Sequence, residues 1–365
     1  MSEKHPPLKR PAISARETAR LEEDRLANLL MEKLIVSPEE AELGKPKPED
    51  EAGPMPFLQR LSRRGLITTG QAQRLRQSLN TLLAQGVPGY ELIERIGQGS
   101  TAQVFKARQA GPDRLVALKV MTQRGGHDAD KFLALARAWA RLRHPRLVQV
   151  LDAGCSPFPF CALEYLPFPS LDRDPRILPP AGPLNERNLT RIGLHASEAL
   201  AYLHKKKIIH RDIKPANLFR LDDGSLLVGD LGLAIWSDVD PHRAREQRLA
   251  LGTPYYMPPE QISNEPPLDG RADLYALGAT LFHLATGRVP YPGENPDVVH
   301  RQHQEAPVPR LAALRPDLSA PFCDIVATLM SKEPKNRPMD AQTVVDLLSR
   351  HEARLLVMPA SAKAR

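Results

Sequence analysis

The chain has 365 residues, a formal net charge of +7 and a pI near 9.3. Its Lys and Arg residues are scattered rather than gathered into a stripe, so we expect no nucleic-acid partner. No run approaches the roughly 18 uninterrupted apolar residues of a membrane span, and residues 1–20 lack the apolar core of a secretory signal. We therefore expect a cytoplasmic protein without a membrane span.

The composition, with 36 prolines and only 5% aromatic residues, favours a globular protein with many loops and some disordered segments. Its length suits one large domain or two modest ones. Cys155, Cys161 and Cys323 form neither a Cys-x-x-Cys pair nor a metal-ligand spacing. We expect reduced, packed thiols.

Residues 1–56 read as an N-terminal extension with one short helix and a linker. Ser14 begins a possible capping box, leucines recur at helical spacing between residues 21 and 34, and Pro38 would end this helix. The segment 37–56 contains five prolines and six acidic residues but hardly any apolar ones. Such a segment can bury too little apolar surface to offset the conformational entropy lost on ordering, so we predict that it is an unstructured linker, a tether.

Residues 57–89 favour a helical hairpin. Apolar residues recur at helical spacing on either side of a break at Gly65, and Thr69 is a candidate N-cap for the second helix. A hairpin of this kind can pack against the following domain, bind a regulatory partner or mediate self-association. The sequence leaves these alternatives open.

Residues 97–104, Gly-Gln-Gly-Ser-Thr-Ala-Gln-Val, form a glycine-rich loop in which backbone amides can approach nucleotide phosphates. A dinucleotide-binding fingerprint would continue into a helix, but here a β-favouring stretch and a second strand, 115–120, follow. The loop therefore joins two antiparallel strands. Lys119 ends the strand motif Val-Ala-Leu-Lys, 20 residues after Gly99, where a lysine contacts the α- and β-phosphates.

Residues 210–218 read His-Arg-Asp-Ile-Lys-Pro-Ala-Asn-Leu and lie between an amphipathic helix, 196–204, and a hydrophobic run, 225–228. The spacing suits phosphoryl transfer. Asp212 can take the proton of a substrate hydroxyl, and Asn217, five positions later, can hold a magnesium ion.

The triplet Asp230-Leu231-Gly232 follows the apolar strand 226–228 and lies 18 residues after Asp212. We predict that Asp230 is a second metal ligand and that Leu231 packs below it. Hard oxygen ligands together with triphosphate oxygens suit Mg²⁺.

Together these motifs resemble those of the eukaryotic-like (Hanks-type) serine/threonine protein kinases of bacteria, from about Tyr90 to about Leu348. The resemblance implies an α+β, bilobal protein-kinase fold over residues 90–357, with a small β-rich N-lobe, a larger helical C-lobe and a short tail at 358–365. It also implies an enzyme that binds ATP and Mg²⁺ and transfers the γ-phosphate to Ser or Thr of protein substrates, including itself.

The same resemblance implies that apolar side chains line the adenine-binding site and that a hinge, residues 163–166, closes it. Backbone groups of the hinge are expected to form hydrogen bonds with the adenine. The nucleotide-binding residues expected on this basis, besides Lys119, are Ile96, Gly97, Gly99, Val104, Ala117, Glu164, Leu166 and Phe219.

Lys214, two residues after Asp212, and the run 252–256 imply serine/threonine specificity by resemblance. In such kinases the arginine before the catalytic Asp, here Arg211, commonly binds a phosphate on the activation segment. Ser237 and Thr253 are the candidate phosphorylation sites, although Thr253 can also be a turn hydroxyl.

Two further roles implied by the resemblance are structural. Glu260 is expected to pair with Arg337. Asp273 is expected to be a buried helix residue that steadies the backbone of the catalytic loop.

One element departs from the family pattern. The helix 130–143 normally supplies a glutamate that pairs with Lys119, but counting back from His144 places Leu135 there. At about 100° per residue, Asp130 points to another face of the helix. Three readings stay open: a lysine held by other means, a site completed or replaced by a partner, or nucleotide binding without turnover. Even the first predicts low intrinsic activity, because a misplacement of about 1 Å can cost about 10²-fold in rate.

Two rival functions also remain at this point. A pseudokinase-like scaffold would bind nucleotide or a partner without turnover, which Leu135 favours and the intact motifs around Asp212 oppose. A small-molecule phosphotransferase shares the fold, but the segment 252–260 argues for protein substrates.

Overall fold

The computed structural model describes residues 27, 30, 36–45, 54–68, 71, 87–98, 102–121, 127–155, 159–175, 184–231, 234–236, 253–263 and 268–357. The chain divides into two compact units. Unit 1 comprises residues 1–136 and 151–165, and unit 2 comprises residues 137–150 and 166–365. Among the described residues, no helix is both long and apolar enough to cross a membrane.

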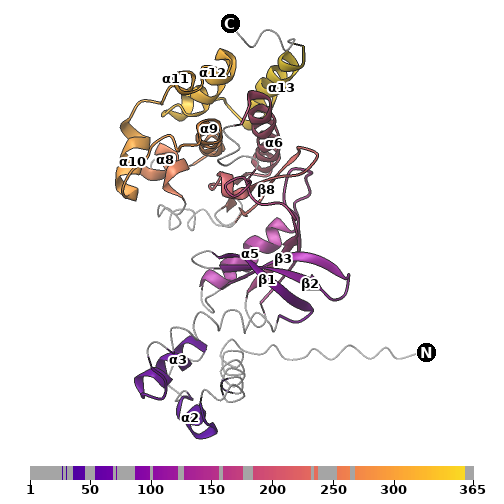
Figure 1. The fold of residues 1–365 in the computed structure, drawn as a ribbon, viewed down its shortest axis with the longest axis vertical. Helices are drawn as coiled ribbons and strands as arrows, with labels where there is room; N and C mark the ends of the chain where they lie inside the picture. The colour runs from indigo at the N-terminus through magenta and orange to yellow at the C-terminus, as the bar shows by residue number, and fades with distance from the viewer. Residues whose placement is uncertain are drawn as a thin grey trace, which may run out of the picture. The chain divides into compact units, whose positions relative to one another are not determined.

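Unit 1 contains a five-stranded sheet in the order β1-β2-β3-β5-β4 (Figure 1). The strands are β1 Tyr90–Gln98, β2 Ala102–Gln109, β3 Arg114–Met121, β4 Val150–Gly154 and β5 Phe160–Glu164, and helix α5, His127–Trp139, joins β3 to β4. The pairs β1/β2, β2/β3 and β3/β5 are antiparallel. This sheet confirms the β-rich part of the expected α+β fold.

Side chains alternate between the two faces of this sheet. On β3, Val116, Leu118 and Val120 are buried, whereas Ala117 and Lys119 between them are only half-buried. Because successive residues of a strand point to opposite faces, one face of the sheet forms a hydrophobic core and the other stays more accessible.

The segment expected to be a tether contains two helices, α2 Pro38–Leu43 and the start of α3 Pro54–Arg63. Pro38 therefore begins a helix instead of ending one, and the prediction of a tether is wrong for these residues. Ser37 and Glu40 form a reciprocal capping box, with Glu40 N 3.2 Å from Ser37 Oγ and Ser37 N 2.7 Å from Glu40 Oε2. A proline is well tolerated at the first position of a helix because its missing N–H would have no partner there.

The hairpin expected at residues 57–89 is described only in its first half. After α3, the chain turns at Gly65, whose φ of +72° lies in the left-handed region, as the predicted break requires. The cap of the next helix is Thr68, not Thr69: Gln71 N donates to Thr68 Oγ1 at 3.1 Å and Thr68 N donates to Gln71 Oε1 at 2.8 Å. Residues 72–86 and the Ser14 capping box lie outside the described residues.

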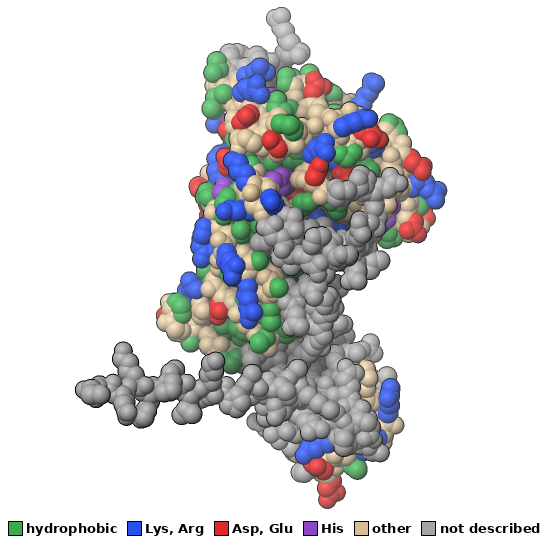
Figure 2. Space-filling view, turned by 180° about the vertical axis from the view of Figure 1, so that it is seen from behind, with side chains coloured by type: hydrophobic (Ala, Val, Ile, Leu, Met, Phe, Trp, Pro, Cys, Tyr) green, Lys and Arg blue, Asp and Glu red, His purple; other side chains and the backbone are tan. Residues whose placement is uncertain are grey.

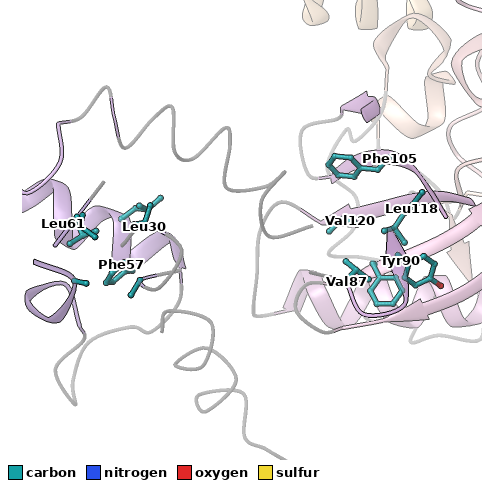
Figure 3. Packing of buried hydrophobic residues seen from close by; sticks show 14 of the residues in the cluster. Leu30, Phe57, Leu61, Val87, Tyr90, Phe105, Leu118 and Val120 are labelled. Carbon is teal, nitrogen blue, oxygen red and sulfur yellow. The ribbon is translucent and has the colours of Figure 1, made fainter. Parts of the chain in front are cut away.

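Many of the buried apolar residues of unit 1 form one cluster with members in helices and strands. Figure 3 shows Leu30, Phe57 and Leu61 together on the helices, and Val87, Tyr90, Phe105, Leu118 and Val120 on the side of the sheet. Phe57 and Leu61 are fully buried, so their burial stabilises a segment in which few other residues are apolar.

Unit 2 is helical and confirms the second part of the expected fold. Its helices are α6 Glu186–Lys205, α8 Pro259–Ser263, α9 Arg271–Thr286, α10 Pro296–Glu305, α11 Leu311–Leu314, α12 Ala320–Leu329 and α13 Ala341–Val357. Helix α9 is buried along most of its length and packs against α6 and α12, and α13 packs against α6 (Figure 1).

Short turns and two-stranded ladders complete unit 2. They are β6 Ile208–Ile209 with β9 Ile235–Trp236, β7 Leu218–Arg220 with β8 Leu226–Val228, and the 3₁₀ turns η1 Pro215–Asn217, η3 Pro254–Tyr256 and η4 Pro334–Asn336. On the helical unit, the face in Figure 2 shows Lys and Arg side chains interspersed with Asp and Glu.

The three cysteines differ in their surroundings. Cys161 and Cys323 are buried, but Cys155 is exposed, so the expectation of a packed thiol is wrong at Cys155. Cys155 directly follows β4, where the chain leaves the sheet.

Candidate active site

The catalytic-loop backbone is held by Asp273, in the first turn of α9. The carboxylate is fully buried; Oδ2 accepts a hydrogen bond from His210 N and Oδ1 accepts one from Arg211 N, both at 2.8 Å. His204 Nε2 lies 2.8 Å from Oδ2. Burial by itself raises the pKa of Asp273, but the bonds and charges of His204 and His210 outweigh it and lower the pKa below its ordinary value. This arrangement confirms the role predicted for Asp273.

Arg211 has a left-handed backbone with φ of +66°. Such a conformation costs of the order of 1–3 kcal/mol for a residue other than glycine and persists only where neighbouring contacts hold it. The hydrogen bond from Arg211 N to Asp273 supplies one such contact. The Arg211 side chain is itself buried, and this desolvation lowers the pKa of its guanidinium while Asp273 opposes the change.

The predicted base, Asp212, lies at the centre of a polar cluster. Its Oδ2 atom lies 2.8 Å from Lys214 Nζ and 2.8 Å from Asn217 Nδ2, which also donates to the Asp212 carbonyl at 2.7 Å. Within the described residues, Asp212 Oδ1 accepts no hydrogen bond. The turn η1, which begins at a proline, brings Asn217 back onto the loop.

Lys214 also reaches the segment ahead of η3. Its Nζ atom donates to Thr253 Oγ1 at 2.7 Å, so one ammonium group binds both the base Asp212 and the hydroxyl of Thr253. The structure therefore joins these three predicted residues. Ser237 lies outside the described residues.

The β7/β8 hairpin brings Asp230 towards Asn217. Gly229 N donates to the Asn217 carbonyl at 2.9 Å, and Asp230 follows with a left-handed φ of +58°. His210 joins the two segments: its Nδ1 accepts from Asp212 N at 3.3 Å, which leaves Nε2 to donate to the Gly229 carbonyl at 3.0 Å. The two predicted metal ligands, Asn217 and Asp230, therefore lie at the two ends of the β7/β8 hairpin.

The donor atoms of Asn217 and Asp230 fit a magnesium ion. The Asn217 amide nitrogen is committed to Asp212, so its amide oxygen is the atom left for a cation. Mg²⁺ commonly takes only one or two protein oxygens and completes its octahedron with phosphate oxygens and water. The described part of the chain contains no group of three or more His, Cys, Asp or Glu able to hold a metal.

The nucleotide-binding residues predicted on the strands share the accessible face of the sheet in unit 1. Val104 pairs with Lys119 across β2 and β3 and with Gly97 across β1 and β2, and Ala117 lies two residues before Lys119 on the same face. A Cβ on Gly97 would lie 3.5 Å from the Val104 side chain. Gly99 lies outside the described residues.

The remaining predicted nucleotide contacts are placed as follows. Ile96, at an irregularity of β1, is 37% exposed, and Glu164 ends β5 opposite Val116. In unit 2, Leu166 is half-buried, and Phe219 on β7 lies against Gly229, where an added Cβ would come within 3.1 Å of its ring. A larger residue at 229 would push this ring aside.

Helix α5 runs from His127 to Trp139. Leu135 is half-buried in it, and the described side chains of this helix, from residue 132 to residue 139, include no carboxylate. Those side chains therefore offer no acidic partner for Lys119. The side chains of Asp128 and Asp130 lie outside the described ones.

The segment after Thr253 is fastened to the helices around it. Glu260 and Arg337 form the predicted ion pair, with N–O distances of 2.5 and 2.8 Å, and the guanidinium carbon of Arg337 lies 4.8 Å from the centre of the Tyr275 ring. Tyr256 OH lies 2.7 Å from His283 Nδ1. Tyr256 is thereby attached to helix α9, and Glu260 is attached to Arg337, which follows η4.

Two histidine contacts of this site were missed by sequence reasoning, the His204–Asp273 pair and the Tyr256–His283 pair. Each joins residues far apart in the chain, 69 and 27 residues respectively. In each helix the only local signal was a histidine in the last turn, and polar residues are common at solvated helix ends too.

The comparisons with known proteins agree with this geometry. A family model described as "Protein kinase domain" matches residues 90–347. The DNA damage-responsive serine/threonine-protein kinase RqkA of Deinococcus radiodurans is 37% identical over 262 residues, which cover 71% of this chain and 39% of RqkA.

Two further relatives are serine/threonine-protein kinases. PknF of Mycobacterium tuberculosis is 35% identical over 275 residues, 70% of this chain and 55% of PknF, and PknB of Mycolicibacterium smegmatis is 34% identical over 276 residues, 72% of this chain and 43% of PknB. The chain thus spans about half or less of the length of these relatives. The chain belongs to the protein kinase family, among the eukaryotic-like serine/threonine protein kinases of bacteria.

Proposed function

We propose that this chain is a serine/threonine protein kinase that transfers the γ-phosphate of ATP to Ser or Thr hydroxyls of proteins. The observation that carries the proposal is the polar cluster in which Lys214 Nζ binds both Asp212 Oδ2 and Thr253 Oγ1 while Asn217 Nδ2 binds Asp212. This cluster supports the proposal because a carboxylate that can act as a base, a cation and an amide that can bind a metal lie around one point of unit 2.

The proposed mechanism follows from which atoms of this cluster remain available to the substrate. Asp212 Oδ2 already accepts a hydrogen bond from Asn217 Nδ2 and forms an ion pair with Lys214 Nζ, so Oδ1 is the atom that orients the substrate hydroxyl and accepts its proton as the new O–P bond forms. Lys214 stabilises negative charge that develops on the transferred phosphoryl group, and ADP leaves with the former bridging oxygen.

We assign the nucleotide phosphates to Lys119 and to the glycine-rich loop on the accessible face of the sheet, and a magnesium ion to Asn217 and Asp230. When bound, the metal supplies charge neutralisation on the phosphate oxygens. Ile96, Val104, Ala117 and Phe219, with the backbone of the hinge at residues 163–166, are assigned to the adenine. The donor set and the shared sheet face support these assignments.

The test is transfer of label from [γ-³²P]ATP to the full chain itself and to a generic protein such as casein or myelin basic protein. We expect incorporation on Ser or Thr, and loss of at least about 10³-fold in Asp212→Asn, since that change removes the base. A folded wild-type protein that retains ATP with Mg²⁺ yet transfers no label would overturn the proposal and favour a nucleotide-binding scaffold.

Regulation through the activation segment and the N-terminal helices belongs to the same proposal. Arg211 is assigned to a phosphate on Ser237 or Thr253, and a phosphate on Thr253 would have to displace the hydrogen bond from Lys214. The hairpin at residues 57–89 is assigned to packing against the kinase domain, with binding of a regulatory partner or self-association as the alternatives. Mass spectrometry of autophosphorylated protein distinguishes the two phosphorylation sites.

A further inference from the structure

Trp139, the last residue of helix α5, is buried, with only 5% of its surface exposed. Its indole Nε1–H donates a buried hydrogen bond of 2.9 Å to the carbonyl of Val148, nine residues further along the chain. Both residues belong to unit 2. A buried indole N–H needs an acceptor, and many positions in a protein core can supply one. This bond differs from an ordinary core contact because its acceptor lies beside the strand that leads to Asp230.

The segment after α5 pairs with the last residue of β8. Val228 N donates to the Arg146 carbonyl at 2.8 Å, and Val148 N donates to the Val228 carbonyl at 2.9 Å. Leu147 forms a parallel bridge with Val228, and both are buried. The segment is therefore hydrogen-bonded to β8 along its length and to the indole of Trp139 at its end.

The side chain of Val148 also contacts the residue that precedes Asp230. A Cβ added to Gly229 would lie 3.2 Å from Val148 Cγ2, so this side chain lies directly against the glycine. Gly229 N is itself bonded to the Asn217 carbonyl. Asp230 has a left-handed φ of +58°, and a residue other than glycine keeps such a conformation only where neighbouring contacts hold it. Val148 thus helps to hold the backbone that leads to the predicted metal ligand.

The other end of the segment is attached to helix α6. Arg146 Nε lies 2.7 Å from Glu198 Oε2, and Arg143 N donates to Tyr202 OH at 3.1 Å. The ring of His144 stacks on Tyr202 with 4.9 Å between the ring centres. These contacts act on residues 143–146, whereas the bond from the indole acts on the end of the segment that lies against Gly229.

We propose that Trp139 is a positioning residue for phosphoryl transfer. By holding Val148 against β8, its indole N–H fixes the backbone that leads to Asp230. The inference rests on the proposed kinase function. The described side chains of α5 include no carboxylate, so the indole provides an uncharged attachment for the end of this helix. Without the N–H, the buried Val148 carbonyl would lose this bond, and small displacements of a reacting group lower the rate steeply.

The first measurement is hydrogen exchange of the metal-free, full-length protein, which requires no activity. Trp139→Phe keeps an aromatic ring and removes the donor. We expect the amides of Val148, Val228 and Gly229 to exchange at least about 10-fold faster than in wild type, because a buried bond that holds them is lost, while the amides of α9 keep their wild-type rates. A second variant carries β-(3-benzothienyl)alanine at position 139. Its bicyclic ring has nearly the shape of indole but sulfur in place of the N–H, so it should give the same result.

The second measurement is the dependence of activity on Mg²⁺ at a fixed ATP concentration. Both variants should need about threefold to tenfold more Mg²⁺ for the half-maximal rate, because the backbone that carries the metal ligand is held less well. Their affinity for ATP in the presence of EDTA should stay at the wild-type value. The control Val344→Ala removes buried surface from α13, which packs against α6, and so lowers the stability of unit 2. It should leave the exchange rates at β8 and the Mg²⁺ requirement near wild type.

The outcomes separate this inference from the proposed function. If Trp139→Phe and the benzothienyl variant keep the wild-type exchange at Val228 and Gly229, or the wild-type Mg²⁺ requirement, the role of Trp139 is wrong while the kinase activity stands. If Val344→Ala raises the Mg²⁺ requirement as much as they do, the effect is one of stability and the positioning role is equally wrong. If wild-type protein transfers no phosphate, the proposed function fails and the role of Trp139 in phosphoryl transfer fails with it, whereas the exchange data still show whether the indole holds β8.

Discussion

The Nζ atom of Lys214 lies 2.7 Å from the Oγ1 atom of Thr253, 39 residues further along the chain. The same ammonium lies 2.8 Å from Asp212 Oδ2. Thr253 therefore acts as a neutral acceptor that holds the lysine in place beside the base, and the segment ahead of η3 is coupled to the catalytic loop by one hydrogen bond.

The hydroxyl of unphosphorylated Thr253 should be needed for activity, because it binds Lys214. Hydrogen bonds to charged groups contribute about 1.5–3 kcal/mol, so Thr253→Val should lower kcat/KM by about 10-fold to 100-fold, whereas Thr253→Ser should stay near wild type. Steady-state kinetics with nucleotide affinity measured in parallel check this. A fully active valine variant would show that Lys214 needs no hydroxyl partner.

The leucine at position 135 of α5 should limit the rate of phosphoryl transfer. Because Leu135 stands where related kinases place a glutamate, Leu135→Glu supplies a charge that can hold Lys119, and we expect autophosphorylation to become up to about 10-fold faster. Leu135→Gln, which has the same shape without the charge, is the matched control and should show no gain. An unchanged rate in the glutamate variant would mean that Lys119 is held well enough already.

The stability of unit 2 should depend on pH through Glu186 at the start of α6. Its Oε1 accepts from Ser319 Oγ at 2.6 Å and lies 2.7 Å from His351 Nε2, and its Oε2 accepts from Ser319 N at 2.7 Å. Burial by itself raises the pKa of Glu186, but these hydrogen bonds outweigh it, so the folded pKa lies below the ordinary value of 4.5. The stabilisation is therefore present above about pH 4.5 and is lost as the pH falls through the folded pKa.

Chemical denaturation of Glu186→Gln tests this dependence. At pH 7 we expect the free energy of unfolding to fall by about 1–3 kcal/mol, and the difference from wild type should shrink as the pH falls below 4.5 and through the folded pKa, since the wild-type carboxyl becomes protonated over that range. Glu305→Gln, at an exposed position on α10, is the control and should behave like wild type at both pH values. A difference that stays constant with pH would exclude the proposed titration.

The site residues that lie close together in the sequence were the ones that the sequence predicted best. Asp212, Lys214 and Asn217 lie within one loop and one 3₁₀ turn, so their separation along the chain nearly determines their separation in space. The same holds for the alternating burial of β3, which the pattern around Lys119 already indicates. The Glu260–Arg337 and Asp273 contacts were predicted only through the family resemblance.

Other expectations failed where a few contacts outweighed composition. A capping box at Ser37 and burial of Phe57 and Leu61 order residues that read as a tether, because each satisfies backbone donors or removes apolar surface from water. Thr68 rather than Thr69 caps the next helix, since helix ends are uncertain by a residue or two until the reciprocal bond to Gln71 is seen.

The sequence by itself therefore determined the family, the order of the elements and the residue types at the reacting centre, because these depend on local spacing and on side-chain chemistry. Only the tertiary structure decided that His204 supports Asp273 and that Thr253 holds Lys214. Those contacts join residues 69 and 39 positions apart in the chain, and which distant side chains meet is set by the packing of helices around a common core rather than by any local pattern.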